Sequence, residues 1–191
     1  GYEQRHALVR QPSYIWACCA ECGTLEVMRI VVCVKHVPDM QSERRFEGGR
    51  LVRGEDDVLN ELDENAIEAA VQLKESEEDA GREAEVVALT MGPEDAEDSL
   101  MRALQMGADR AYIVSDEFLE GSDVITTASV LSVAIAKIAQ ECGPVDLVLT
   151  GMASLDAMTS MLPAALAAKA HLPLLGLARS LSVEGGVVTI E

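Results

Sequence analysis

Short apolar runs alternate along this chain with segments long enough to form helices, and this alternation limits the possible folds more than any other feature. Uninterrupted apolar runs are typical of strands that are covered on both faces of a sheet. Strands that are separated by helices form βαβ units with parallel strands and right-handed crossovers. The sequence therefore predicts a doubly wound α/β fold with a mostly parallel sheet, whose strands are the segments 30–34, 85–90, 110–114, 145–150 and 173–178.

The segments between these runs predict the helices. Apolar side chains recur at helical spacing in the first of them, 61–75, and Ser122 is expected to cap the helix that follows it. Residues 180–191 alternate around Gly185-Gly186 and predict a C-terminal β-hairpin. Residues 37–57 are polar and predict an irregular excursion or a small hairpin. The stripe expected to face the core in the first helix is Leu62, Ala66, Ala69, Ala70 and Leu73.

The first 27 residues differ in character from the rest of the chain of 191 residues. We expect residues 1–27 to be a poorly ordered N-terminal extension and 28–191 to be a single domain, truncated at its C-terminus. Cys19 and Cys22 form a CxxC pair in the extension, but a structural zinc site needs four ligands, so we expect no metal. The few remaining cysteines fit a reducing compartment, and we expect a cytoplasmic protein.

The net charge of −18 excludes two classes of partner, because nucleic acids and anionic membranes require clustered lysine and arginine. No run approaches 18 consecutive apolar residues, so we expect no membrane insertion. His36 is interpreted as a histidine of a loop or a partly buried one. His171 follows the end of a helix, where a cation is favourable. Because no nucleophile, base and acid can be assembled from the sequence, we expect no catalytic site.

Pro163 fixes the place where the last helix can begin. Proline fits the first turn of a helix, where its missing N–H would have no intrahelical partner, so we expect the helix to start at about Ser160. The N–H groups of Ser160, Met161 and Leu162 should then be free. Free N–H groups and the positive end of the helix dipole form an anion site of phosphate size without a lysine.

The loop before this helix contributes further candidate groups. The hydroxyl of Thr159 can donate to the same anion, as can that of Ser160, and Gly151 allows a ligand to approach the backbone closely. A purely structural interpretation stays open. In that case Asp156 holds its own turn and Ser160 is an ordinary N-cap.

Several motifs, in this order and spacing, are similar to those of the β subunit of electron transfer flavoprotein. The resemblance runs from about Arg29 to Glu191. The stretches that carry it are "VCVKHVPD" (32–39), "VLNELDENAIEAAVQLKE" (58–75), "ALTMGPEDAEDSLMRALQMGADRAYIV" (88–114) and "DLVLTGMASLDAMTSMLPAALAAKAHLP" (146–173).

This resemblance implies a Rossmann-like fold of the adenine-nucleotide-binding type and an electron-carrier subunit that is not itself an enzyme. Such a subunit buries an AMP as structure and pairs with an α subunit that holds most of the FAD. The pair carries electrons from acyl-CoA and related dehydrogenases, as in fatty acid oxidation, to a membrane quinone reductase. The location would be cytoplasmic, or the mitochondrial matrix in a eukaryote. The family's AMP contacts correspond to Cys33, Asn60, Met91, Gly151, Asp156, Thr159 and Ser160, and we add Met161 for its free N–H.

The sequence departs from the family in two places. Ala157 and Met158 stand where members have Gly or Asp and a Gly-rich approach to the helix. The family also continues past the hairpin with a loop that inserts a leucine into dehydrogenases, so we interpret the chain as a fragment or a shortened paralogue. The alternatives are a bifurcating subunit that binds FAD in place of AMP, a free-standing nucleotide-binding protein of universal-stress type, and an adenylating pyrophosphatase.

Overall fold

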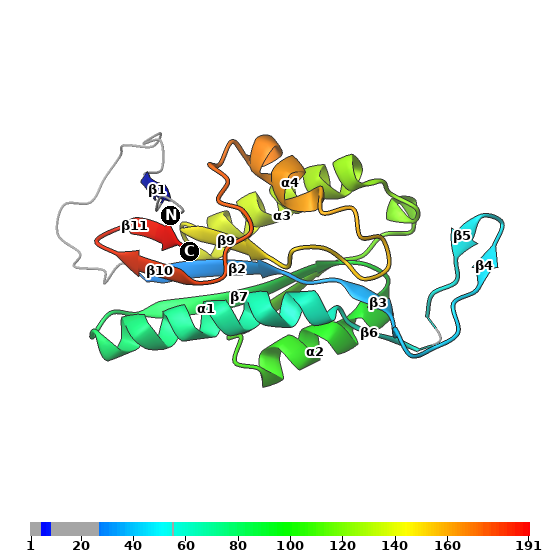
Figure 1. Cartoon of the computed structure of the whole chain (residues 1–191), viewed down its shortest axis with the longest axis horizontal. Helices are drawn as coiled ribbons and strands as arrows, with labels where there is room; N and C mark the ends of the chain where they lie inside the picture. Colours follow the sequence, from blue (N-terminus) through cyan, green and yellow to red (C-terminus); the bar gives the residue numbers. More distant parts are fainter. Residues whose placement is uncertain (1–4, 9–26, 55) are drawn as a thin grey trace.

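A four-stranded parallel sheet forms the centre of the computed structural model, which describes residues 5–8, 27–54 and 56–191 (Figure 1). Its strand order is β8-β7-β2-β9, and every neighbouring pair is parallel. This confirms the predicted doubly wound α/β fold. The strands are β2 (Met28–Cys33), β7 (Ala84–Met91), β8 (Arg110–Val114) and β9 (Leu147–Thr150).

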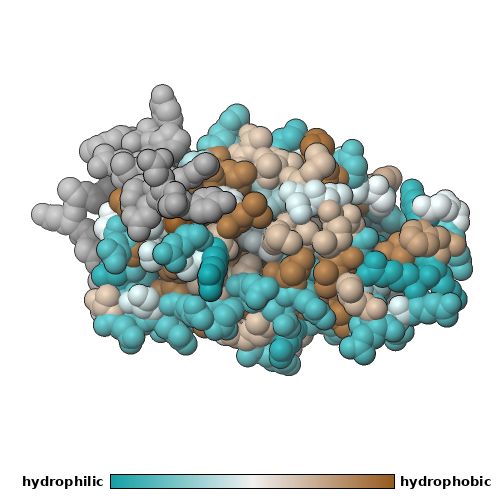
Figure 2. All heavy atoms as spheres, viewed as in Figure 1, coloured by the Kyte–Doolittle hydropathy of each residue, from teal (hydrophilic) through white to brown (hydrophobic). Residues whose placement is uncertain are grey.

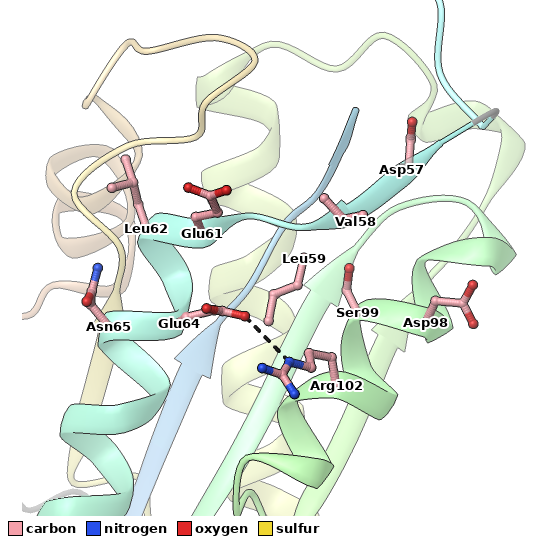
Figure 3. A pocket seen from close by; sticks show the side chains of 10 residues that line it. All are labelled: Asp57, Val58, Leu59, Glu61, Leu62, Glu64, Asn65, Asp98, Ser99 and Arg102. Carbon is pink, nitrogen blue, oxygen red and sulfur yellow. Dashed lines mark ion pairs between the residues drawn. The ribbon is translucent and has the colours of Figure 1, made fainter. Parts of the chain in front are cut away.

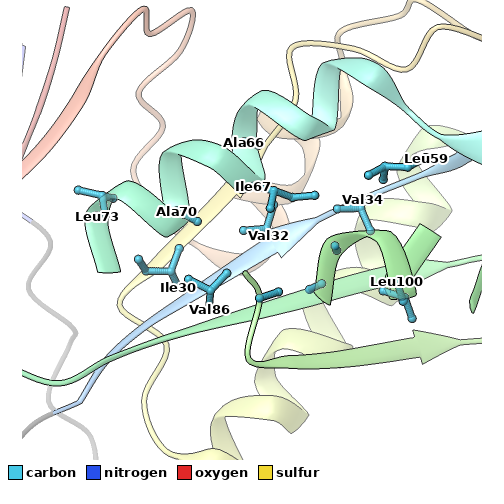
Figure 4. Packing of buried hydrophobic residues seen from close by; sticks show 13 residues of the cluster. Ile30, Val32, Val34, Leu59, Ala66, Ile67, Ala70, Leu73, Val86 and Leu100 are labelled. Carbon is cyan, nitrogen blue, oxygen red and sulfur yellow. The ribbon is translucent and has the colours of Figure 1, made fainter. Parts of the chain in front are cut away.

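Two helices cover each face of the sheet. On one face α1 (Glu61–Asp79) and α2 (Glu97–Gln105) enclose an aliphatic cluster with Ile30, Val32 and Val34 (Figure 4). On the other face α3 (Val124–Cys142) and α4 (Leu162–Ala170) pack against the alternate side chains of the same strand. Because β2 lies between two strands and two helix layers, its residues from Arg29 to Cys33 are all buried. This explains its uninterrupted apolar sequence.

The buried face of α1 is rotated from the predicted stripe. Leu62 and Ala69 are only half-buried, whereas Ile67 is fully buried and Asp63 is buried beside it. The helix therefore places a carboxylate, and not only apolar groups, at the edge of the core. Asp123, not Ser122, caps α3, because its Oδ1 accepts a hydrogen bond of 2.7 Å from the N–H of Thr126.

A long excursion leaves the carboxyl end of β2 and returns to the start of α1. At its base β3 (His36–Pro38) pairs with β6 (Asp57–Leu59), and at its tip β4 (Phe46–Glu47) pairs with β5 (Arg50–Leu51). We call residues 39–56 the arm, which extends away from the body of the molecule (Figure 1). The sequence prediction of a small hairpin in this segment is confirmed.

The C-terminal hairpin is also confirmed. It consists of β10 (Leu181–Glu184) and β11 (Val187–Ile190), and β11 pairs antiparallel on its other side with β1 (Arg5–Leu8). Apart from β1 and the half-buried Val27, residues 1–27 lie outside the described residues. The prediction that this extension is poorly ordered, and its Cys19–Cys22 pair, fall on that part of the chain. Across the described residues, no group of three or more metal-ligating side chains occurs.

The predicted strand at 173–178 is wrong. These residues form no strand, and Leu174 and Leu177 are exposed, so β9 remains the edge of the sheet. An apolar run makes a strand only when an adjacent edge pairs with it, and the run alone does not show this. The helix α3 is long and apolar enough to cross a membrane, but the core helices of other proteins meet the same criterion of length and composition. Four of its side chains pack on the sheet, namely Ala128, Leu131, Ile135 and Ile138.

Candidate functional site

The carboxyl ends of the parallel strands meet the start of α1 and the loop before α4, where ligands of doubly wound sheets bind. Cys33 at the end of β2 lies opposite Leu89 of β7 and Thr150 of β9. The chain leaves β9 at Gly151 and reaches α4 through residues 151–161, which we call the 151–161 loop. The candidate site is this loop together with the strand ends beside it.

Asn60 joins the start of α1 to the 151–161 loop. Its side chain is fully buried, donates a hydrogen bond of 2.9 Å to the carbonyl of Ala153 and accepts one of 3.0 Å from the N–H of Leu155. Its own N–H donates to the carbonyl of Lys35 at 2.9 Å. The amide therefore satisfies both a donor and an acceptor of the loop backbone, since its NH₂ group donates while its oxygen accepts. Asn60 was predicted as a site residue, and the structure places it against the loop.

Asp63 is a residue of this region that the sequence analysis missed. Its carboxylate accepts a hydrogen bond of 2.8 Å from the N–H of Lys35 and a second from the N–H of Gly151, so it links the ends of β2 and β9. Burial raises the pKa of Asp63 to about 6, although these hydrogen bonds, a bond from Asn60 and the charge of Lys35 act in the opposite direction. A sequence signal was present, because Asp63 falls on the same helical face as the buried Ala66, Ile67 and Ala70.

Asp156 is at the centre of an ion-pair cluster. The ammonium group of Lys35 lies 3.0 and 2.9 Å from its two carboxylate oxygens, and the guanidinium group of Arg53, from the arm, pairs with it as well. The carboxylate is 1% exposed, whereas the side chains of Lys35 and Arg53 are 41% and 39% exposed. Burial alone would raise the pKa of Asp156, but the bonds from Arg53 and Lys35 hold that pKa well below its ordinary value. Asp156 thus does more than hold its own turn.

The helix after the 151–161 loop begins later than predicted. The helix begins at Leu162 with Met161 as its N-cap, and Ser160 is exposed with a φ of 51°. Ser160 is therefore not the N-cap. Met158 also has a positive φ, of 50°. Both occupy the left-handed region that costs a residue with a side chain roughly 1–2 kcal/mol, a strain that is concentrated at functional sites.

This strained backbone leaves donors without a protein partner. Within the described ranges, no group accepts a hydrogen bond from the N–H of Ser160, Met161 or Leu162. Thr159 and its neighbours at the loop end are exposed, so these donors face solvent. Together with Lys35, 41% exposed beside the same loop, they form a donor set of the kind that binds a phosphate.

Two predicted site residues take part differently. Cys33 is buried and packs toward α3 and α4, and burial, reinforced by the charge of Asp63, raises the pKa of its thiol to about 12. A thiol of this kind is an apolar contact and not a nucleophile. Met91, at the end of β7, is partly buried against the same cluster. Both can form an apolar wall beside the loop, which would suit a purine ring.

A separate surface pocket of about 710 Å³ lies between the start of α1, β6 and α2 (Figure 3). Its single cationic side chain, Arg102, is paired with Glu64 at 3.5 Å. Since carboxylates prevail in the lining, the pocket would repel a phosphate. It is therefore a poorer candidate than the 151–161 loop for an anionic ligand. The carboxylates of the lining are those of Asp57, Glu61, Glu64 and Asp98.

A known protein family matches most of the chain. Residues 49–191 match the family model described as "Electron transfer flavoprotein domain". The chain belongs to the electron transfer flavoprotein family. Within the family it is similar to β subunits: it is 40% identical over 165 residues to the electron transfer flavoprotein subunit beta of Mycobacterium tuberculosis and 38% identical over 169 residues to that of Megasphaera elsdenii. The resemblance seen in the sequence is confirmed.

These alignments cover 85% and 86% of the chain, but only 60% and 61% of the two electron transfer flavoprotein β subunits. The chain thus spans about 60% of the length of the relatives it matches. It is also 36% identical over 159 residues to the caffeyl-CoA reductase-Etf complex subunit CarD of Acetobacterium woodii, covering 82% of the chain and 58% of that protein.

Proposed function

We propose that this chain is the nucleotide-binding part of an electron transfer flavoprotein β subunit and that it binds AMP as a structural cofactor. The observation that supports this most is the set of free N–H groups at Ser160, Met161 and Leu162, in the same loop whose Asp156 pairs with the ammonium group of Lys35. These groups would hold the phosphate. Cys33, Met91, Asn60, Gly151, Asp156 and Thr159 would line or support the rest of the site.

Identification of the nucleotide tests this proposal. Denaturing the purified chain should release AMP in an amount close to one per chain, measured by liquid chromatography and mass spectrometry. Release of FAD instead would assign the chain to the bifurcating alternative, with FAD in the same loop. A protein that releases no nucleotide and binds neither AMP nor FAD when they are added would contradict the proposal.

The electron-carrying part of the proposal requires a partner. We propose an α subunit that carries FAD, acyl-CoA or related dehydrogenases as electron donors, and a quinone reductase as acceptor, in the cytoplasm or the mitochondrial matrix. The chain would then contribute no catalytic group of its own. The word subunit in the names of its relatives supports an assembly of this kind.

Exposed apolar side chains are concentrated on the α3–α4 side of the sheet. The α1–α2 side is mostly hydrophilic, whereas apolar side chains gather around α4 and the segment after it (Figure 2). On the outer surface of α3, Val133 is 70% exposed and Ile125 is 46% exposed. Surfaces of this kind are covered by partner proteins. We therefore propose that the α subunit covers α3.

Replacing Val133 with glutamate should remove most of the α subunit that co-purifies with the chain. A charge buried in an interface without a partner is costly, whereas the free chain leaves position 133 exposed, so its folding should not change. The measurement is the flavin absorption and the α-subunit band after co-expression and purification. Met101→Glu on α2, where Met101 is 54% exposed, is the matched control and should leave both unchanged. Equal yields from the two variants would exclude α3 as the interface.

A further inference from the structure

Two arginines of the arm contact the 151–161 loop. Arg53 pairs with the carboxylate of Asp156, and Arg44 donates a hydrogen bond of 3.2 Å to the carbonyl of Leu155. These two loop residues are adjacent in the chain: the N–H of Leu155 also donates to Asn60, and the carboxylate of Asp156 also accepts from Lys35. The arm and the body of the molecule therefore contact the same two residues of the loop.

We propose that Arg53 is a positioning residue for the nucleotide loop, an inference that rests on the proposed function. Arg53 acts through Asp156 and does not need to touch the nucleotide. The carboxylate of Asp156 is 1% exposed, and a buried carboxylate is stable only when cations and donors compensate for its lost hydration. Arg53 of the arm and Lys35, which lies between β2 and β3, supply this compensation.

The position of Asp156 fixes the backbone that follows it. The N–H groups of Ala157 and Met158 both donate to the carbonyl of Ser154, at 3.2 and 2.8 Å, so Asp156 lies inside a tight turn. Met158 and Ser160 then have left-handed backbone angles before the free N–H groups. Because those angles are strained, this part of the loop depends on its attachments to hold its shape. When Arg53 is lost, Lys35 still pairs with Asp156, and the turn keeps its backbone bonds to Asn60 and Arg44, but the buried carboxylate has lost one of its two cations.

Arg50 is the matched control on the same arm. It pairs with Glu120 at 3.0 Å, and both side chains are exposed, at 67% and 81%. The pair joins the tip of the arm to the segment before α3 and does not involve the 151–161 loop. Loss of a pair this exposed changes stability very little. Arg50→Ala therefore removes a cation from the arm without removing support from Asp156.

The test uses the whole chain with AMP as the probe and compares Arg53→Ala, Arg53→Lys and Arg50→Ala by isothermal titration calorimetry. Arg53→Ala should weaken AMP binding about tenfold, which corresponds to the loss of roughly one charge-assisted hydrogen bond. Arg53→Lys should recover most of the affinity, and Arg50→Ala should stay within about twofold of the wild type. An unchanged affinity in Arg53→Ala would overturn the proposal.

A double-mutant cycle shows whether Arg53 acts through Asp156. Once Asp156→Asn is present, the further change Arg53→Ala should have little effect on AMP affinity, whereas independent effects would contradict the assigned role. Amide hydrogen exchange of Ala157 and Met158, whose N–H groups donate to the carbonyl of Ser154, gives a readout that needs no nucleotide, and it should be faster in Arg53→Ala only. If the wild type binds neither AMP nor FAD, the proposed function fails. The exchange rates then still decide whether Arg53 holds the loop.

Discussion

Replacing Gly151 with alanine should lower the free energy of unfolding by about 3 kcal/mol or more, the upper end of the cost of overpacking a core. A Cβ at position 151 would lie 2.8 Å from the backbone C and O atoms of Leu62 and would collide with the carboxylate of Asp63. Backbone atoms at the start of α1 cannot move aside, so the end of β9 and α1 would separate. The measurement is the midpoint of chemical denaturation, together with AMP binding, which should be lost.

Gly176→Ala is the control for this experiment. Gly176 has no atom within 4 Å of the position of an added Cβ, and its φ does not lie in the left-handed region. Its replacement should change the free energy of unfolding by less than about 0.5 kcal/mol. If Gly151→Ala were equally harmless, the close contact between β9 and α1 would not be a feature of the folded protein.

The contribution of Asp63 to stability should fall by roughly 2.4 kcal/mol as the pH is raised from 4 to 7, since one pKa unit corresponds to about 1.4 kcal/mol. Burial raises its pKa from 3.8 to about 6. Between these two values the folded state binds more protons than the unfolded state, so stability decreases as the pH rises through this window. Above the folded pKa the loss is complete. Below the unfolded pKa the contribution is fully present.

Comparison with Asp63→Asn isolates this effect from the other carboxylates of an acidic chain. The free energy of unfolding is measured for both proteins by denaturant titration at several pH values between 4 and 7. The wild type should lose stability more steeply than the variant over this range. Parallel curves would show that Asp63 has an ordinary pKa in the folded protein.

The sequence predicts the layers of this fold well, because each of the four strands of the parallel sheet overlaps a predicted apolar run. The run at 173–178 is also apolar, but it contains Pro173 and Gly176 and no β-branched residue, a composition that strands disfavour, and it pairs with no strand. The predicted start of α4 was also wrong. Pro163 limits where the helix can begin, but the left-handed angle at Ser160 depends on how the whole loop is attached.

Several residues of the 151–161 loop, and one residue that holds it, are predictable from the sequence, whereas the other residues that hold the loop are not. Asn60 and Asp156 were identified, whereas Arg53, Lys35 and Asp63 were not. The sequence does not show which carboxylate an arginine in a polar segment will pair with, because its partner depends on where the arm lies in the folded chain. Whether the predicted residues bind AMP stays a prediction that the release experiment addresses.

The bonds from Asn60 also determine the order in which the chain can assemble. They join residues that are 93 and 95 positions apart, and the pair between Lys35 and Asp156 spans 121 positions. Contacts over such distances form only after the intervening strands have paired, because closing a long loop costs entropy before any contact forms. On the ribosome the loop can therefore take its shape only after residue 156 has emerged, when all four strands of the parallel sheet have been synthesised.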